Sequence, residues 1–389
     1  MAKEIGYVFI NPYSLRKSRT GGIISRLLAR TQLELIGARM FAPSKKMIDE
    51  YVEAIREVIT DKKHKAKVRE LFVKYLYENY APDKVTGERK RVMCLLFKGD
   101  EAVEKLKNVV GAVSTDSGGE TIRETYGDYI QDVDGNIKYF EPAVVTGVSI
   151  SETKKQLEIL AKYSDKEGGL LEDVVSYRKM EKVQKTLVLI KPDNFRFPSG
   201  RPGNIIDSFS RTGLFIIGAK VLQMSVSQAE EFYGPVKEVL REKLKFMVRN
   251  KVENSLNDAF PFDIPSKLVD SITEKLKGLN AETSFNQIVN FMTGYDLTKS
   301  ISAKEKKARG KVKCLALCYQ GYNAIEKIRD QLGSTDPSKA AVSTVRKEFG
   351  QNVMENTAHA SDSPKNALRE MKIIGIKENY FKKVIKEYL

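Results

Sequence analysis

Apolar residues in this chain gather in short runs, and the segments between the runs show the apolar spacing of amphipathic helices. One run lies in YVFINP, which ends at Pro12, and a similar run lies in TLVLIKP, which ends at Pro192. Runs of about five to seven residues are typical of strands, and the periodic segments between them are typical of helices. The pattern therefore predicts a protein of mixed strands and helices.

The same order of segments occurs twice. GGIISRLLARTQLELIGAR follows the first run and GNIIDSFSRTGLFIIGAK follows the second, and an Arg-Thr pair in the first recurs in the second at an offset of 181 positions. Further on, VMCLLFKGDEAVEKLK resembles KCLALCYQGYNAIEKIR, and ETIRETYG resembles STVRKEFG, which aligns Arg123 with Arg346. Such self-similarity indicates two copies of one structural unit.

Each copy reads as strand, helix, strand, and then a second set of the same kind. This order predicts an α+β fold of two ferredoxin-like (βαββαβ) domains, each an antiparallel sheet with helices packed on one face. We expect the first domain at residues 1–165, a linker at 166–182 and the second domain at 183–389. The second domain contains two extra segments, a helical insert at about 236–283 and a basic loop at about 296–313.

Composition and charge restrict the expected location of the protein and the kinds of partner that it can bind. No stretch approaches the roughly 20 apolar residues of a membrane span, and the apolar run near the first residue is too short for a signal peptide, so we expect a cytoplasmic protein without a membrane partner. The formal net charge is +15, and the basic loop holds seven Lys or Arg against two acidic residues. This charge suits an anionic partner but does not distinguish nucleotides from nucleic acid. Three cysteines in apolar segments predict neither a disulfide framework nor a zinc site.

The most informative short stretch is NTAHASDS, residues 356–363, because it contains one of only two histidines. The other, His64, lies in the basic stretch DKKHKAK and is interpreted as a solvated residue. His359 lies between two alanines, which leave room for a phosphate beside the ring. A neutral imidazole can attack a phosphoryl group without first losing a proton to another base. The stretch therefore makes His359 a candidate nucleophile.

Several motifs in order give the second half a resemblance to nucleoside diphosphate kinases. They are IKPD, GNII, EEFY ending at Tyr233, FNQIVNFM, GYNAIEKIRDQLGSTDP, TVRKEF and NTAHASDS followed by Glu370. The resemblance implies a ping-pong reaction in which His359 takes the γ-phosphoryl of a nucleoside triphosphate and passes it to a diphosphate. It also implies Mg²⁺ held mainly by nucleotide phosphates, with no metal site of the protein's own.

The resemblance assigns a role to each matching residue. Glu370 orients the imidazole of His359 with the help of Ser361, and Lys191 takes part in catalysis and in nucleotide binding. The remaining residues implied to contact the nucleotide are Tyr233, Phe285, Arg329, Thr335, Arg346 and Asn356. Phe285 departs from the family pattern, because the alignment through the insert places Ser284 at the base-stacking position and Phe285 next to it.

The first half resembles the same family but lacks its chemical groups. Asn11 stands where the second half has Lys191, Lys107 replaces Arg329, and Thr146 aligns with His359. Ala143 aligns with Asn356, and only Arg123 and Tyr51 keep their residue types. We therefore expect the first domain to be an inactive copy.

Two other functions remain open from the sequence. The inserts could have disabled turnover, which would leave a nucleotide-binding sensor or scaffold. Nucleic-acid binding would use the positive charge, but no RNP, helix-turn-helix or zinc motif supports it, and Trp is absent. The expected partners are nucleoside di- and triphosphates, with a homo-oligomer such as a trimer of tandem chains.

Overall fold

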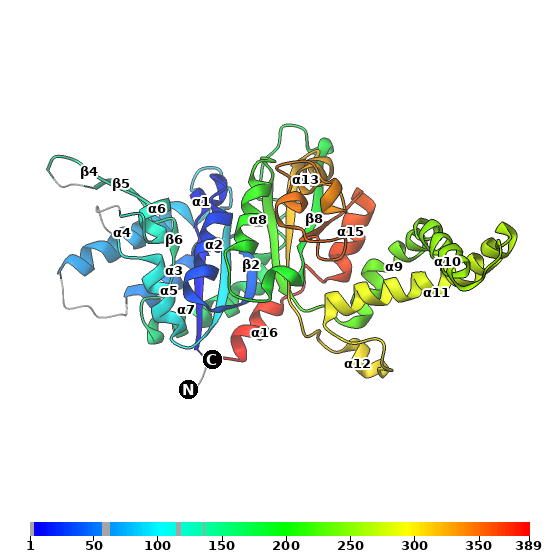
Figure 1. Ribbon diagram of the computed structural model, residues 1–389. Coiled ribbons are helices and arrows are strands. Elements are labelled where there is room, and N and C mark those ends of the chain that lie inside the picture. Colours follow the sequence, from blue (N-terminus) through cyan, green and yellow to red (C-terminus); the bar gives the residue numbers. More distant parts are fainter. Residues whose placement is uncertain (1–3, 57–62, 114–117, 135–136) are drawn as a thin grey trace. The chain divides into compact units, whose positions relative to one another are not determined.

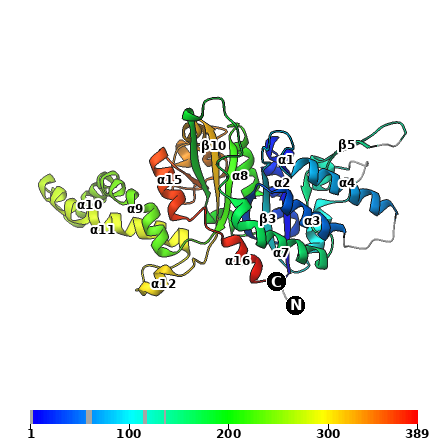
Figure 2. The same cartoon turned by 180° about the vertical axis from the view of Figure 1, so that it is seen from behind.

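A computed structural model describes residues 4–56, 63–113, 118–134 and 137–389 (Figure 1, Figure 2). The chain divides into two units by its internal contacts. The first comprises residues 1–222 together with 314–389, and the second comprises residues 223–313. None of the described helices combines the length and the apolar composition that crossing a membrane requires.

Two antiparallel sheets form the centre of the first unit, so the protein is of the α+β class. The strands of the first sheet are β1 (Glu4–Ile10), β2 (Glu34–Phe41), β3 (Val92–Gly99), β6 (Val144–Val145) and β7 (Gly168–Gly169), in the order β6-β1-β3-β2-β7. The strands of the second sheet are β8 (Val183–Ile190), β9 (Phe215–Leu222), β10 (Cys314–Tyr322) and β11 (Ala358–Ala360), in the order β11-β8-β10-β9. The two orders agree, apart from β7, because β1, β2, β3 and β6 occupy the same places in the first sheet as β8, β9, β10 and β11 do in the second.

Helices surround both sheets. Those of the first copy are α1 (Pro12–Arg16), α2 (Thr20–Thr31), α3 (Lys45–Arg56), α4 (Lys63–Asn79), α5 (Ala102–Val110), α6 (Ile122–Tyr126) and α7 (Ile150–Glu167). Those of the second copy in this unit are α8 (Arg201–Ser210), α13 (Ala324–Leu332), α14 (Val345–Phe349), α15 (Pro364–Ile373) and α16 (Tyr380–Lys386), with three short 3₁₀ turns, Met180–Lys182, Pro192–Phe195 and Pro337–Lys339. A two-stranded hairpin, β4 (Asp128–Gln131) and β5 (Ile137–Glu141), projects from the first copy.

Strand β1 shows that helices cover both faces of the first sheet, not one face as we expected from the sequence. Val8 and Ile10 join a buried cluster with side chains of α2 and α5. Tyr7 and Phe9 point the opposite way and join a cluster with α3, α4 and α7. Because successive strand residues face opposite sides, a strand that is apolar throughout must be buried on both.

The two copies share one core and meet through a close helix crossing. The cluster on the α2 side of the first sheet continues into residues of α8, β8 and β10. Helices α2 and α8 pack together, and strands β2 and β9 are also in contact. A Cβ atom on Gly203 would lie 2.2 Å from the backbone nitrogen of Ser25, and one on Gly21 would lie 2.4 Å from that of Asp207. The glycines therefore permit a spacing between the helices that larger residues would prevent.

The strand register corrects the predicted alignment of the two active-site strands. His359 pairs with Leu189 in the second sheet, and Val145 pairs with Phe9 in the first, so Val145 and not Thr146 corresponds to His359. Likewise Asn356 corresponds to Pro142 and not to Ala143. The misalignment arises because the hairpin of β4 and β5 lengthens the first copy between α6 and β6, and sequence similarity is lost across it.

The second unit is helical within the residues that the structure describes. It contains α9 (Val226–Lys243), α10 (Lys245–Ala259), α11 (Ser266–Thr293) and α12 (Ala303–Lys307). Helices α10 and α11 enclose a small cluster of Val248, Val252 and Val269, and ion pairs such as Arg249 with Asp270 (2.9 Å) link the two helices. The predicted insert of 236–283 lies within α9 to α11, and the predicted basic loop includes α12.

Candidate active site

His359 lies in the middle of the three-residue strand β11. Its neighbours Ala358 and Ala360 are buried in the core shared by the two copies, so the imidazole faces the other side of the strand. The alanines are therefore small chiefly because they pack in that core. Thr357, the residue just before β11, has a φ of +80°, which is rare for a β-branched residue. Strain of this kind is often found at functional sites.

Glu370 holds the imidazole in one orientation. Helix α15 begins at Pro364 behind the cap residue Ser363, whose Oγ accepts a hydrogen bond from the backbone N–H of Asn366. This start places Glu370 on the buried face of the helix. Its Oε2 lies 2.9 Å from Nε2 of His359 and accepts a hydrogen bond of 2.6 Å from the Ser361 hydroxyl. The structure thus brings together the three residues His359, Glu370 and Ser361.

Lys191 lies just after β8 and reaches the stretch that leads into β11. Its Nζ donates to Oδ1 of Asn356 (2.6 Å) and to the carbonyl of Met354 (3.2 Å). The Nδ2 of Asn356 donates in turn to the carbonyl oxygens of Thr335 (3.0 Å) and Val353 (2.8 Å). Asn356 therefore joins the predicted lysine to the loop that contains Thr335.

Burial and, to a smaller extent, the charge of the nearby Arg346 guanidinium lower the pKa of Lys191 to about 8. Removing an ammonium from water disfavours its charged form, and a second cation close by adds repulsion. Lys191 is therefore poised to gain stabilisation from any anion that enters the site.

Arg346 is fixed by backbone carbonyl groups. Its Nη1 donates to Gly333 and its Nη2 to Ala358, each at 3.0 Å. In the first copy, Arg123 donates in the same way to Gly111 (2.5 Å) and Val144 (3.4 Å). The two arginines, which the sequence aligns, thus make similar contacts with backbone carbonyl groups.

A cavity of about 360 Å³ opens beside His359. It is lined by Arg329, Leu332, Gly333, Ser334, Thr335, Arg346, His359, Ala360 and Asp362. Four of the predicted residues, His359, Arg329, Thr335 and Arg346, thus share one cavity. Two arginines next to an imidazole suit an anionic, phosphate-bearing ligand.

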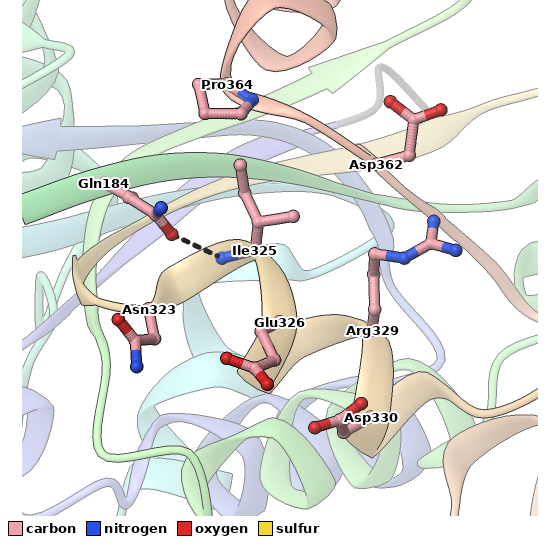
Figure 3. A pocket seen from close by; sticks show the side chains of 8 residues that line it. All are labelled: Gln184, Asn323, Ile325, Glu326, Arg329, Asp330, Asp362 and Pro364. Atoms are coloured by element: carbon pink, nitrogen blue, oxygen red, sulfur yellow. Dashed lines mark hydrogen bonds between the residues drawn. The ribbon is translucent and has the colours of Figure 1, made fainter.

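A second cavity of about 370 Å³ adjoins the first at Arg329 and Asp362. Figure 3 shows that the Arg329 guanidinium extends from α13 toward Asp362 and away from Asp330. Glu326, Asp330 and Asp362 give this second cavity an acidic lining, which is unfavourable for phosphate. Burial raises the pKa of Asp362, but hydrogen bonds from Asn366 and Ser363 and the charge of Arg329 outweigh it, so the net pKa is lowered.

Tyr233 and Phe285 belong to the other unit of the chain. Phe285 is buried on α11, with the Lys237 ammonium 5.5 Å from the centre of its ring. Tyr233 is buried on α9, and its ring centre lies 4.9 Å from that of Phe232. Their predicted contacts with a nucleotide stay predictions.

Three residues of the site were missed in the sequence. Asp362 lines both cavities, and Asn194 donates to the carbonyl oxygens of Lys191 (3.1 Å) and Thr357 (2.8 Å). Arg201 donates to the carbonyl of Phe349, just as Arg19 of the first copy donates to that of Tyr126. The internal repeat could have indicated Arg201, because Arg19 and Arg201 come shortly before the glycines that begin the two similar stretches GGIISRLL and GNIIDSFS.

Comparison with known proteins agrees with this geometry. A family model described as nucleoside diphosphate kinase matches residues 184–252 and 282–379. A nucleoside diphosphate kinase of Bdellovibrio bacteriovorus is 30% identical over 189 residues, which are 49% of this chain and 90% of that protein. The chain belongs to the nucleoside diphosphate kinase family.

Other relatives match the same share of the chain. A nucleoside diphosphate kinase of Dehalococcoides mccartyi (strain CBDB1) is 27% identical over 191 residues, covering 49% of this chain and 91% of the relative. A solved NDP kinase from Pyrobaculum aerophilum is 25% identical and covers 49% of this chain and 94% of that one, with a TM-score of 0.35. Because the family model matches residues 184–252 and 282–379, the family match rests on the second half of the chain. The first half is an additional α+β region.

Proposed function

We propose that the second half of this chain is a nucleoside diphosphate kinase that works through a phosphohistidine at His359. The observation that carries the proposal is the Glu370-oriented imidazole at the edge of a cavity lined by Arg329, Arg346 and Thr335. The substrates are nucleoside tri- and diphosphates. In the first half-reaction an N–P bond forms as a P–O bond of the triphosphate breaks. In the second half-reaction that N–P bond breaks as a new P–O bond forms on the diphosphate.

The contact with Glu370 selects the reactive nitrogen. When Nε2–H of His359 donates to the carboxylate, Nδ1 carries the lone pair and can attack the γ-phosphorus. The bond from that phosphorus to the bridging oxygen breaks, and the nucleoside diphosphate leaves with the electron pair. A second diphosphate then reverses the sequence through its own terminal oxygen, which regenerates the neutral imidazole.

Charge neutralisation is the main task of the remaining residues. The transition state of phosphoryl transfer spreads negative charge over the equatorial oxygens, which Arg329 and Arg346 are placed to approach. Within the described residues, no three His, Cys, Asp or Glu side chains gather closely enough to hold a metal ion. Mg²⁺ carried by the nucleotide phosphates would supply further neutralisation of their charge beside Arg329 and Arg346.

We also propose that the first half is an inactive copy of the same domain. Val145 stands at the position of His359 and Asn11 at that of Lys191, so the imidazole and the ammonium group are both absent. The Arg123 guanidinium lies 4.9 Å from the centre of the Phe72 ring of α4. Nδ2 of Asn11 donates instead to the buried carboxylate of Glu141 (3.0 Å). In the first half, Arg123 and Asn11 thus contact side chains of that half itself.

Brief incubation with Mg²⁺ and γ-labelled ATP tests the kinase proposal. We expect acid-labile label on the protein, mapped by peptide analysis to His359 and removed by added GDP. Binding of nucleotide by the folded protein without any label would contradict it and support the sensor or scaffold alternative.

Replacing Glu370 with glutamine should slow phosphorylation of His359 by about 10- to 100-fold, because an amide fixes the required tautomer less firmly than a carboxylate. Affinity for ADP should stay near that of the wild type, since Glu370 does not line the cavity. Rapid-quench measurement of label transfer, together with ADP titration, checks both expectations. An equal loss in affinity and rate would show that the substitution damaged the site as a whole.

The pKa of Lys191 predicts how nucleotide affinity depends on pH. Below pH 8 the ammonium is largely charged and ADP affinity should be nearly constant. Above pH 8 the free protein must take up a proton to bind, so affinity should fall by up to about tenfold per pH unit. Calorimetry in buffers of different ionisation enthalpy will detect that proton. Lys191→Arg should remove the pH dependence, and its persistence in this variant would place the titrating group elsewhere.

A further inference from the structure

Lys220 of β9 and His359 of β11 face the same side of the second sheet, although their strands form its two edges. His359 pairs with Leu189 of β8, which pairs with Ala316 of β10. Ala316 pairs in turn with Lys220. Residues paired in this way across antiparallel strands lie on one face. Helix α15 packs on β8 and contacts the imidazole through Glu370, so the lysine and the histidine both face this helix.

The Lys220 ammonium caps the end of helix α15. Its Nζ donates to the carbonyl oxygens of Ile374 (2.9 Å) and Gly375 (2.7 Å). The last carbonyl groups of a helix have no acceptor role within the helix, and the helix dipole makes that end partly negative, so a cation is favourable there. The Lys220 side chain is only 12% exposed, and the carboxylate of the exposed residue Glu378 lies 3.9 Å away. The two carbonyl groups are therefore the closest partners of the lysine.

The capped end lies one turn beyond Glu370. The backbone N–H of Ile374 donates to the Glu370 carbonyl (3.1 Å), so one residue joins the contact of the lysine to the turn of the carboxylate. Gly375 then ends the helix with a φ of +58°, as is common at this position. The buried apolar residues of α15 are Ala367 and Met371, and so short an apolar face holds a helix weakly. The contacts at the helix ends therefore help to set the position of Glu370.

The first copy has a cation at the matching strand position. Arg39 of β2 corresponds to Lys220 at the repeat offset of 181 positions. It donates to the carbonyl oxygens of Ser164 and Gly168, each at 3.1 Å, at the end of α7. Arg39 also donates to the Glu378 carbonyl (3.2 Å), just after α15. The first copy thus holds the chain that leaves the helix of Glu370.

The capped helix end lies at a different place in the two copies. Gln156 follows Val145 by the same interval as Glu370 follows His359, so the two residues occupy matching places. Helix α7 continues for about three turns beyond Gln156, whereas α15 ends about one turn beyond Glu370. The cap therefore lies next to this place in the copy that has the carboxylate and the histidine. This difference indicates that the cap of α15 serves Glu370.

We propose that Lys220 is a positioning residue for Glu370. By capping α15 it fixes the turn that carries the carboxylate, and the carboxylate selects the Nε2–H form of the His359 ring. The effect on phosphoryl transfer rests on the proposed function. The effect on the imidazole does not, because it concerns the protein without any ligand.

NMR of the protein with ¹⁵N-labelled histidine rings tests the proposal without nucleotide, at about pH 8.5, where an ordinary histidine is neutral. The His359 signal is assigned by its loss in His359→Ala. In the wild type we expect the Nε2–H form almost alone, and Lys220→Met should convert about a fifth or more of the molecules to the Nδ1–H form. The same variant should slow phosphorylation of His359 by about three- to tenfold, less than a change at Glu370 itself. ADP affinity should stay near that of the wild type, since Lys220 does not line the cavity.

Two further lysine variants separate positioning from general damage. Lys185→Met is the matched control, because Lys185 lies on β8 of the same sheet and pairs with Glu172. It should keep the wild-type ring form and rate. Lys220→Arg should restore both to within about twofold of the wild type, since arginine makes carbonyl contacts at the matching position in the first copy.

A wild-type ring form in folded Lys220→Met, or an equal change in Lys185→Met, would overturn the proposal. A ring as disturbed in Lys220→Arg as in Lys220→Met would also contradict it. Circular dichroism establishes that each variant is folded, and Lys220→Gln, which keeps a neutral donor, takes the place of Lys220→Met with the same expectation if the methionine variant does not fold. Absence of phosphorylation in the wild type would contradict the proposed function and leave the NMR result standing, so the two failures are distinguishable.

Discussion

Replacing His359 with alanine should lower phosphoryl transfer by roughly four orders of magnitude or more, because the variant removes the nucleophile on which both half-reactions depend. No other described side chain offers a matching nitrogen at this cavity, where the remaining nitrogen groups are the guanidinium groups of Arg329 and Arg346. ADP affinity should fall little, since the cationic lining is retained. Steady-state exchange between ATP and a second diphosphate, measured together with protein-bound label, gives both quantities.

The chain contains its own control for this experiment. His64 is the only other histidine, and His64→Ala should keep full exchange activity and full label. If His359→Ala retained exchange above about one part in a thousand while His64→Ala lost it, the nucleophile would be wrongly assigned. If both variants kept the label, the modified residue would have to be sought outside the two histidines.

The sequence predicted the parts of the site that depend on local chemistry and repetition. His359, Glu370 and Ser361 are connected as expected, and the equivalence of Arg123 and Arg346 is visible in matching carbonyl contacts. Similar residues at similar spacing produce such contacts because each belongs to a short continuous segment. The α+β class followed in the same way from strand-length runs alternating with helical segments.

Features that depend on strand register or on contacts between distant residues could not be predicted from the sequence. A shift by one residue reverses the face of a strand, so the error between Thr146 and Val145 could not be seen in composition alone. The second layer of helices on the first sheet involves α7, which the sequence placed next to a linker. The contact of Arg201 with Phe349 spans 148 positions and could not be predicted, although the internal repeat does place Arg19 and Arg201 at matching positions.

Replacing Gly203 with valine should destabilise the first unit by about 3 kcal/mol or more, which corresponds to a fall in Tm of several degrees. The new Cβ would lie 2.2 Å from the backbone nitrogen of Ser25 and 2.5 Å from the carbonyl oxygen of Gly21. These are backbone atoms of α2, so no side-chain rotation can relieve the clash and the two helices must separate. Thermal unfolding followed by circular dichroism measures the loss.

Gly278 provides a matched comparison, because it also lies within a helix but has open space around its Cβ position. Gly278→Val should change stability by less than about 0.5 kcal/mol, since valine is at least as good a helix former as glycine. A Gly203→Val protein as stable as Gly278→Val would mean that α2 and α8 can move apart without cost. The expected difference instead gives the first copy a physical reason to persist without its nucleophile. Its helix α2 and its share of the common core support the copy that carries His359.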